Sequence, residues 1–562
     1  MLPSFLGCLG LVFAVTLGLA WPIAARLTLA PAEKIVASAA LSLLGAFLIA
    51  WGVYILALPL AVLWIVPGLA SAGLLTGWRT LRVTVRDPDT RELAVGQVFV
   101  TGWCVGWLSF VTTYSGGGWA LDWFEHWERA RFFLERWPHD RLFLAFYPVP
   151  ARPPLANVVT GVFLALTRID FAHFQLLATV FSSLVFLPAA LLARRFGSGR
   201  NAIAALAVLA MLNPVFLQNA TFAWTKLPTA FFVLAALYFF LRASDAEAPR
   251  TAATLFSLCL AAGMLTHFSA GPYAVALALG WVALGRRRWN DRGWWRTTLL
   301  AGLTGGLVLA TWFGWSLATY GVKGTFFSNT SAILHDPTPG AQLAKMALNL
   351  RDTLIPHFLR PVDSPILDQA STWGRARDWF FQLYQVNLLF GCGSVAGVAL
   401  LVSLRRAWRE DATGSRAGWA TFVGLVVVLG VCTHGTRDVW GLAHICLQSL
   451  IVLGLAVLAA RWRALGGRWR TALVAGATLD FTTGIAFHFA VENYALDRWF
   501  PQGRSADEMM LSYTEAGRFN IAAKVQHQIA FFADVFTPAP ALVLALLAGL
   551  FSLALLRAAR SA

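Results

Sequence analysis

The chain alternates long apolar runs with short polar connections over nearly its whole length. A helix needs about 20 apolar residues to cross a bilayer hydrocarbon core of roughly 30 Å. Runs near that length predict membrane-spanning helices. They fall at about 2–20, 35–54, 57–77, 95–113, 173–193, 201–217, 227–241, 252–267, 270–285, 297–316, 385–404, 417–432, 442–460, 471–490 and 538–557. The pattern therefore predicts an all-α polytopic membrane protein with about 14–15 transmembrane helices.

Basic residues gather in one set of connections between these runs. These connections are 79–91, 194–200, 286–296, 405–416 and 461–470, with a basic tail from 557. Cytoplasmic loops of membrane proteins carry an excess of Lys and Arg, and placing this set in the cytoplasm lets the spans alternate without conflict. The N-terminal run has no basic residue before it, so we interpret it as a span and not a signal peptide. The N-terminus, Gly117, Lys226, Asp363 and Ser505 are then expected outside, and Arg288, Arg409 and Arg463 inside.

One apolar segment, 155–169, is shorter than the spans. If it crossed the membrane, the arginines of 194–200 would lie outside, against the charge rule. We therefore expect an interfacial or half-inserted helix there. Residues 114–172 then form a large first extracytoplasmic loop that carries interfacial helices, and the long connections 317–384 and 491–537 lie on the same side. Because function is often carried by loops on a rigid scaffold, the chemistry is expected on this side.

Composition supports a membrane protein and argues against other classes. Hydrophobic residues make up 58% of the chain and charged residues 13%, and the mean hydropathy is +0.64, values that no soluble domain needs. The net charge of +16 comes from arginines in short loops. It therefore indicates orientation in the membrane, and no nucleic-acid partner is expected. The six cysteines lie in apolar segments without a CxxC pair, which supports neither a disulfide framework nor a thiolate metal site.

The loop after Tyr114 concentrates acids, bases and tryptophans. Three glycines precede a helix that we expect to begin near Asp122. On a helical wheel, one face carries Asp122, Glu125, His126 and Arg129. A second, apolar face carries Trp123, Trp127, Ala130, Leu134 and Trp137. A tryptophan-rich amphipathic helix is typical of a bilayer surface, where the acidic face would lie within reach of a lipid headgroup.

The two acids of this helix have two interpretations. As a catalytic pair, Asp122 would act as general base with Glu125 beside it. As a capping box, Asp122 would be the N-cap and Glu125 the third helical residue, following a glycine turn. Spacing alone leaves both open, and the two are compatible because one carboxylate can cap while the other reacts.

Two basic residues are candidates for binding a phosphate. Arg152 precedes Pro153 and Pro154, which suit an extended entry into a helix. The prolines do not explain an arginine at an external surface, where it can hold a phosphate in a bidentate fork. Lys226 lies in a short external connection and is either a second phosphate contact or a lysine that extends from the end of a span to the interface.

Other polar residues give weaker indications. Residues at the external ends of spans are His267, His434, Arg437 and His444. No HExxH or similar spacing occurs, so the pattern gives little support for a metal site. Asp480 lies within a predicted span, where an acid either serves function or bonds a neighbouring helix.

The order of these features resembles a known family. A span is followed by an external loop with an acidic motif, an amphipathic helix, Arg152-Pro153-Pro154-Leu155, another span, a basic turn, and Leu212-Asn213-Pro214 before a short external loop. This order is similar to that of the GT-C superfamily of integral membrane glycosyltransferases. The members that look nearest are the protein O-mannosyltransferase-like and lipid A aminoarabinose-transferase-like enzymes. The resemblance covers roughly residues 95–285.

The resemblance implies a function. A sugar would move from a polyprenyl-phosphate donor to a lipid, glycan or protein acceptor on the extracytoplasmic side, with inversion. Asp122 would be the catalytic base with Glu125 beside it, and Arg152 and Lys226 would contact the donor phosphate. Further candidates for substrate binding are His126, Arg129, His267, Arg437 and His444. No cofactor is certain, and a divalent metal stays open. The chain departs from the family in carrying Lys226 where many members have a second acid, in the spacing Asp-x-x-Glu, and in its three preceding spans.

Two alternatives from other classes remain. A transporter or lipid flippase would place ionisable residues at mid-membrane, where Asp480 is nearly the only clear case. A non-catalytic membrane scaffold would not need the polar face that begins at Asp122. The expected division is 1–94 with extra N-terminal spans, 95–285 as the catalytic membrane module, and 286–562 as a C-terminal membrane region. The expected location is a bacterial cytoplasmic membrane with the site facing outside.

Overall fold

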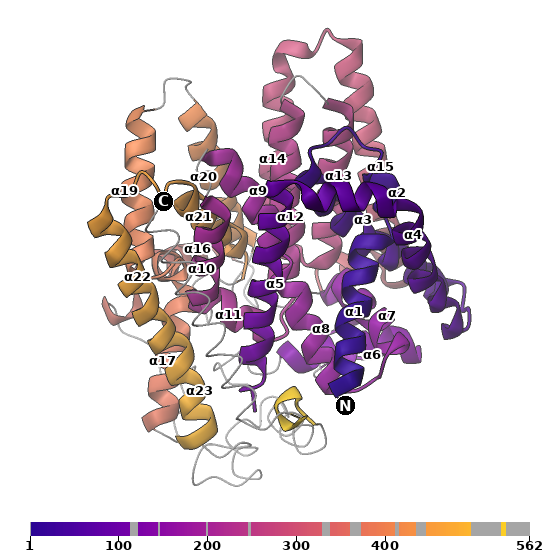
Figure 1. The fold of residues 1–562 in the computed structure, drawn as a ribbon, viewed down its shortest axis with the longest axis horizontal. Coiled ribbons are helices and arrows are strands. Elements are labelled where there is room, and N and C mark those ends of the chain that lie inside the picture. The colour runs from indigo at the N-terminus through magenta and orange to yellow at the C-terminus, as the bar shows by residue number, and fades with distance from the viewer. Residues whose placement is uncertain are drawn as a thin grey trace.

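The chain folds as a bundle of helices, which the computed structural model in Figure 1 shows from the side. The structure describes residues 2–112, 122–143, 147–197, 201–244, 249–328, 338–359, 372–410, 415–433, 445–495 and 530–535. Within these ranges the chain forms helices and no β-strand. The predicted all-α class is therefore confirmed.

The N-terminal part holds five helices whose starts follow from local sequence. They are α1 (Leu2–Gly18), α2 (Trp21–Ala24), α3 (Pro31–Ile55), α4 (Ile65–Arg86) and α5 (Pro88–Leu108), with the 3₁₀ turn η1 (Leu60–Trp64) before α4. Each of α3 and α5 begins with proline, which suits the first helical position. The Glu33 carboxylate accepts the Ala30 N–H at 2.8 Å, and Asp87 accepts the Thr90 N–H at 2.9 Å.

The next helices bring together the segments expected to carry the site. They are α6 (Asp122–Glu135), η3 (Val149–Ala151), α7 (Leu155–Leu166), α8 (Phe171–Ser183), α9 (Phe186–Phe196), α10 (Ala202–Leu212), α11 (Pro214–Thr221) and α12 (Lys226–Ser244). Between α10 and α11 the chain bends by 68°. Pro214 cannot continue the hydrogen bonds of α10, and the Asn213 side chain accepts the Phe216 N–H at 2.8 Å to start α11.

The remaining helices complete the bundle. They are α13 (Pro249–Thr266), η4 (Phe268–Ala270), α14 (Gly271–Gly285), η5 (Arg286–Arg288), α15 (Arg292–Phe326), α16 (Pro339–Leu354), η6 (His357–Leu359), α17 (Thr372–Val386), α18 (Leu388–Gly391), α19 (Ser394–Glu410), α20 (Ser415–Thr433), α21 (Gln448–Ala460), α22 (Gly467–Phe481), η8 (Thr482–Ala486), α23 (Phe487–Ala490), η9 (Val491–Ala495) and η10 (Phe532–Val535). Thus the long connection expected at 317–384 contains α16 and α17.

Nine helices of the described residues are long and apolar enough to cross a membrane, or ten if the bent pair α10–α11 is one span. All nine fall on expected spans, so the polytopic membrane character is confirmed. The number is lower than 14–15 because several apolar runs fold as shorter or more polar helices. These runs correspond to α5, α13, the α17–α19 region and α21, and the run 538–557 lies outside the described residues.

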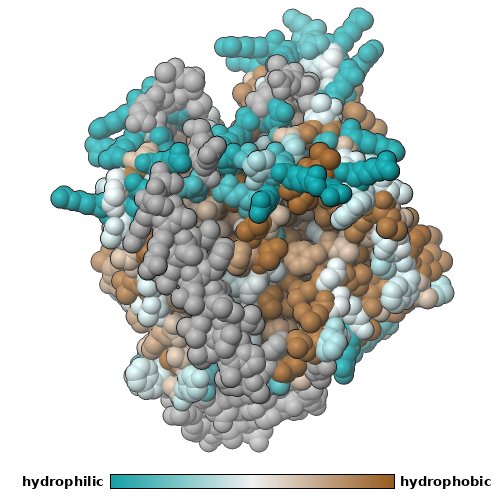
Figure 2. Space-filling view, in the orientation of Figure 1, coloured by the Kyte–Doolittle hydropathy of each residue, from teal (hydrophilic) through white to brown (hydrophobic). Residues whose placement is uncertain are grey.

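One end of the bundle gathers the arginine-rich connections. There Glu33 accepts hydrogen bonds from Tyr238 at 2.6 Å and from Arg242 at 3.0 Å, which joins α3 to α12. Arg194 bonds Asp89 at 2.5 Å and joins α9 to α5. Hydrophilic side chains cover this end, at the top in Figure 2, above a broad apolar band. We call it the arginine-rich end; α6 and α7 lie near the opposite end with the N-terminus (Figure 1).

The helices α6 and α7, expected in the first loop, are buried within the protein. In α6, every residue from Trp123 to Leu134 is buried except the partly exposed Arg131. The next helix, α7, packs on α6 and also contacts α3 and α8. At 12 residues, α7 is about 18 Å long, so it is too short to span a bilayer. The prediction that 155–169 does not cross therefore agrees with its length, and its interfacial or half-inserted placement stays a prediction.

A polar link ties the first helix to the site-bearing half of the chain. Ser4 of α1 and His173 of α8 are joined through Oγ and Nε2 at 2.8 Å. The His173 Nδ1 lies 2.7 Å from Asp170 Oδ1. A carboxylate only accepts hydrogen bonds, so Nδ1 carries the proton, Nε2 accepts, and Ser4 donates. The fully buried His173 thus has partners for both ring nitrogens.

Candidate active site

The centre of the site is an ion pair within α6. Arg129 donates from Nε to Glu125 Oε1 at 2.8 Å, one helical turn away. It also donates to the carbonyls of Val149 at 2.7 Å and Pro148 at 3.1 Å. Its guanidinium lies 4.2 Å from the ring centre of Phe143. Arg129 therefore holds in place the segment at Pro148 and Val149, which leads to Arg152.

Arg152 is the second cation of the cluster. Its side chain is 8% exposed, and its NH2 lies 3.5 Å from Glu125 Oε2. The guanidinium sits 5.0 Å from the ring centre of Tyr147. Burial disfavours the charge, but Glu125 and Tyr147 outweigh it, so the pKa of Arg152 is raised above its ordinary value. Arg152 is extended and leads through two prolines into α7, so the expected extended entry is confirmed.

Asp122 lies where α6 meets the start of α12. The indole nitrogen of Trp224 donates to Asp122 Oδ2 at 3.1 Å. Lys226 Nζ lies 3.6 Å from the same oxygen and 4.6 Å from the ring centre of Trp224. The Asp122 side chain is 19% exposed, whereas that of Lys226 is 7% exposed. Within the described residues, the second oxygen of Asp122, Oδ1, accepts no hydrogen bond.

These contacts decide between the interpretations left open by the sequence. Asp122 accepts no backbone N–H within the described residues, and Glu125 is bound by Arg129. The capping box is therefore not formed. Lys226 is buried against Asp122 and does not extend to the interface. The shared polar face of α6 is confirmed. Arg152 and Lys226, which come from two other segments, contact its two acids.

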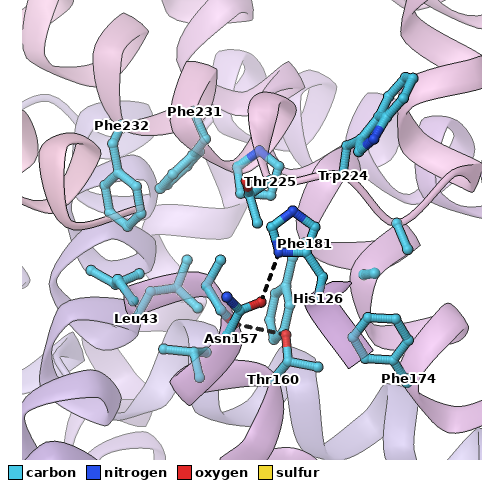
Figure 3. A pocket seen from close by; sticks show the side chains of 16 residues that line it. Leu43, His126, Asn157, Thr160, Phe174, Phe181, Trp224, Thr225, Phe231 and Phe232 are labelled. Carbon is cyan, nitrogen blue, oxygen red and sulfur yellow. Dashed lines mark hydrogen bonds between the residues drawn. The ribbon is translucent and has the colours of Figure 1, made fainter. Parts of the chain in front are cut away.

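His126 of the same face meets α7. Its Nδ1 lies 3.2 Å from Asn157 Oδ1, as the dashed line in Figure 3 shows. An amide oxygen accepts, so Nδ1 donates and Nε2 is left as an acceptor. Burial first, and then the positive charge of Arg152, lower the pKa of His126 to about 3. His126 is therefore neutral at ordinary pH.

A small apolar pocket adjoins the polar cluster (Figure 3). Its walls come from α3, α6, α7, α8, α12 and the turn before α12, with Phe174, Phe181, Phe231 and Phe232 among its aromatic residues. Its cavity of about 30 Å³ has room for roughly one or two water molecules. His126, Trp224 and Thr225 line it, so the same residues that border the polar cluster also border an apolar space.

The remaining sequence candidates are His267, which the structure describes, and three residues that it does not. The buried His267 caps η4, where its Nδ1 accepts the Ser269 N–H at 3.0 Å. His434, Arg437 and His444 lie outside the described residues. Within the part of the chain that the structure describes, no group of three or more His, Cys, Asp or Glu side chains is arranged to hold a metal ion.

Asp480 has a structural explanation. Its Oδ1 accepts from Tyr384 OH at 3.0 Å, and its Oδ2 accepts the Ser394 N–H at 2.8 Å. The first N–H groups of a helix lack partners within it, so Asp480 of α22 caps α19 from outside. Gly393 has φ +102°, and a Cβ there would lie 2.8 Å from Asp480 Oδ2. This close approach requires glycine next to the acid.

Three contacts of the site were missed at the sequence level: those of Trp224, Tyr147 and Asn157. Each of these residues bonds or stacks on a predicted site residue but comes from a different segment. A local signal existed only for Trp224, which lies two residues before Lys226. The other two become visible only when the fold brings 147 and α7 against α6.

Comparisons with known proteins give a likeness of fold. No protein-family model and no curated protein matches the chain. A crystal structure of ArnT from Cupriavidus metallidurans bound to undecaprenyl phosphate is similar, with 16% identity and a TM-score of 0.39, covering 81% of this chain and 90% of that chain. The apo structure of the same protein gives 17% identity and a TM-score of 0.37, with 81% and 89% covered. The residue roles proposed below rest on this chain's own contacts.

Proposed function

We propose that the protein is a membrane glycosyltransferase that moves a sugar from a polyprenyl-phosphate donor to an acceptor hydroxyl or amine. The observation that carries the proposal is the surroundings of Asp122. Its partly exposed carboxylate has one oxygen that accepts no hydrogen bond from the described residues, beside the buried cations Lys226 and Arg152. A general base and a phosphate-binding pair are thus held together at one end of a membrane bundle.

The charge of the cluster favours an anionic ligand. Arg129, Arg152 and Lys226 are set against the carboxylates of Asp122 and Glu125, which leaves one positive charge in excess. Buried charges are costly unless paired. A phosphate near Arg152 and Lys226 would balance this charge, and the small apolar pocket beside Trp224 borders the same cluster.

The reaction follows from these positions. Asp122 Oδ1 takes the proton of the acceptor as its oxygen or nitrogen bonds to the anomeric carbon. The bond between that carbon and the phosphate oxygen breaks, and polyprenyl phosphate leaves with the electron pair. Arg152 and Lys226 stabilise the developing negative charge. A single displacement inverts the anomeric carbon. Glu125 acts as a positioning residue, because it holds Arg129 and neighbours Arg152.

The transporter alternative receives no support from Asp480. An acid that carries ions or protons across a membrane needs to exchange partners. Both oxygens of Asp480 are instead used to bond Tyr384 and to cap α19. The scaffold alternative leaves the buried cations of the cluster unexplained. We further propose that the site faces the extracytoplasmic side of a bacterial cytoplasmic membrane, opposite to the arginine-rich end.

The test is transfer by the purified protein from a panel of polyprenyl-phosphate sugars. Asp122→Asn keeps an oxygen for the Trp224 N–H but removes the base, so we expect a normal melting temperature and a transfer rate lower by roughly 10²–10⁴-fold. Glu135→Gln, at the far end of α6, is the matched control and should retain the rate. An Asp122→Asn protein as active as the wild type would overturn the assignment of the base. Product stereochemistry by NMR tests the inversion.

A further inference from the structure

A second cavity of the described residues lies away from the proposed active site, at the arginine-rich end. It has a volume of about 360 Å³ and is formed by the ends of α12 and α14 and the starts of α13 and α15. Figure 1 shows the turn between α14 and α15 at the top of the molecule. This cavity has no part in the transfer reaction, which uses residues near the opposite end.

The polar lining of the cavity is positive. Arg250 and Arg288 line it from two different helix pairs, and within the described residues neither side chain forms an ion pair or hydrogen bond. Among the described lining residues the one carboxylate is that of Asp291, which accepts the Gly293 N–H at 2.7 Å and caps α15. Within this described lining, two arginines against one engaged carboxylate leave an excess positive charge facing the space. Such a space suits a phosphate group.

The apolar lining of the cavity is aromatic and preorganised. The rings of Trp281 and Trp294 are stacked, with centroids 6.5 Å apart and 15° between their planes. Trp294 is 8% exposed, and no hydrogen bond from its indole nitrogen is found within the described residues. A Cβ on Gly285 would lie 2.1 Å from Trp294, so glycine is required for this packing. The wall thus offers an N–H donor beside the two arginines.

The surface that leads away from the cavity is suited to acyl chains. Leu284 lines the cavity and is 58% exposed. On α15, Leu299, Leu303 and Leu307 are 67%, 61% and 60% exposed and follow one another at every fourth residue, so they form one stripe. Trp289 and Trp295 are also exposed near the turn, as is typical of the membrane interface. A charged cavity continued by a lipid-facing stripe distinguishes a phospholipid from free phosphate.

We propose that this cavity binds the headgroup of an anionic phospholipid, with the phosphate at Arg250 and Arg288 and the acyl chains along α14 and α15. Basic pockets between transmembrane helices are suited to anionic headgroups. Because the cavity joins four helix ends, an occupied site holds the α12–α13 and α14–α15 pairs together. The bound lipid therefore stabilises this end of the bundle, independently of the transfer chemistry.

The experiment uses the delipidated full chain with phosphatidylglycerol, phosphatidylcholine or inorganic phosphate, read by native mass spectrometry and melting temperature. Phosphatidylglycerol alone should bind tightly and raise the melting temperature. The double variant Arg250→Gln with Arg288→Gln should raise the Kd for phosphatidylglycerol by roughly 30-fold, because each arginine near a membrane surface contributes a factor of about five to the affinity. The matched control is Arg286→Gln with Arg287→Gln, which lie in the same turn outside the cavity lining.

Three results would overturn the proposal. They are equal phosphatidylglycerol binding by the Arg250 and Arg288 variant, an equal loss in the control pair, and equal stabilisation by inorganic phosphate. If the double variant fails to fold, Trp294→Phe replaces it, because it keeps the ring stack and removes the N–H donor. That variant should bind phosphatidylglycerol several-fold more weakly, and unchanged binding would count against the site.

Discussion

At the residue scale, Asp122 and Glu125 show how two acids on one helical face receive different roles. Glu125 is fully buried and bound by Arg129, whereas Asp122 is partly exposed and has one oxygen without a hydrogen bond from the part of the chain that the structure describes. Their common face could be predicted from the spacing in α6. Their difference could not, because it depends on Trp224 and Lys226, about a hundred residues later in the chain.

Arg152 provides a test of phosphate binding at the same scale. Arg152→Lys keeps a positive charge but loses the planar fork that holds a phosphate by two hydrogen bonds. We expect the Kd for polyprenyl phosphate to rise by roughly tenfold, a change of about 1.4 kcal/mol, with a lower transfer rate. Arg131→Lys, in a surface pair with Glu135, should leave the Kd unchanged. If Arg152→Ala binds the donor as the wild type does, the arginine only shapes the entry into α7.

His126 gives the stability of the fold a pH dependence. Its pKa is about 3 in the folded protein and 6.5 ordinarily, so below pH 6.5 the unfolded chain binds a proton that the folded chain does not. Stability should therefore fall as the pH drops from 6.5 toward 3, by up to about 1.4 kcal/mol per pH unit. The melting temperature of His126→Gln should fall less between pH 7 and 5 than that of the wild type. The exposed His139→Gln is the control, and identical pH slopes in all three proteins would refute this prediction.

At the element scale, the apolar runs predicted the positions of the helices along the chain better than the surroundings of each helix in the fold. All nine long apolar helices coincide with expected spans. The burial of α6 within the protein could not be predicted, because an amphipathic pattern does not reveal whether its polar face meets water or a buried ion pair. The bend between α10 and α11 follows from Asn213 and Pro214, a local signal present in the sequence.

The cap on α19 is a second test at this scale. Asp480→Ala leaves Tyr384 OH and the Ser394 N–H without an acceptor, and each unsatisfied buried group costs roughly 1–3 kcal/mol. We expect a lower melting temperature in detergent, with an unchanged transfer rate per folded molecule. Asp480→Asn keeps one oxygen as an acceptor, so it should lower the melting temperature less than Asp480→Ala does. A variant that melts normally yet loses transfer activity would give Asp480 a role in function and contradict the purely structural explanation.

At the scale of the whole molecule, the two ends of the bundle differ in charge and in chemistry. The ion pairs of Glu33 and Arg194 mark the arginine-rich end, and the cluster around Asp122 lies toward the other. This division was predictable, because the basic connections recur after every second span. The cavity between Arg250 and Arg288 was not, since its walls come from four helix ends that the sequence treats separately.

The orientation of the bundle in its membrane is testable by labelling. The native cysteines Cys8, Cys104, Cys259, Cys392 and Cys446 are buried and Cys432 is partly buried, so all six are first replaced. In intact cells, an impermeant thiol reagent should label Leu142→Cys, which is exposed near the proposed active site. It should label Arg287→Cys at the arginine-rich end only after the membrane is opened. The reverse pattern would invert the proposed orientation.

The hydrogen bond between Ser4 and His173 has a consequence for biosynthesis. Its two residues are 169 positions apart, which corresponds to roughly 10–30 s of translation at about 5–20 residues per second. During that interval α1 can already pack against α3 and α4, but its contact with α8 is missing. The link from Ser4 is therefore made late, and a slow stretch of codons before His173 would prolong the period in which a quality-control protease can recognise the incompletely assembled α1.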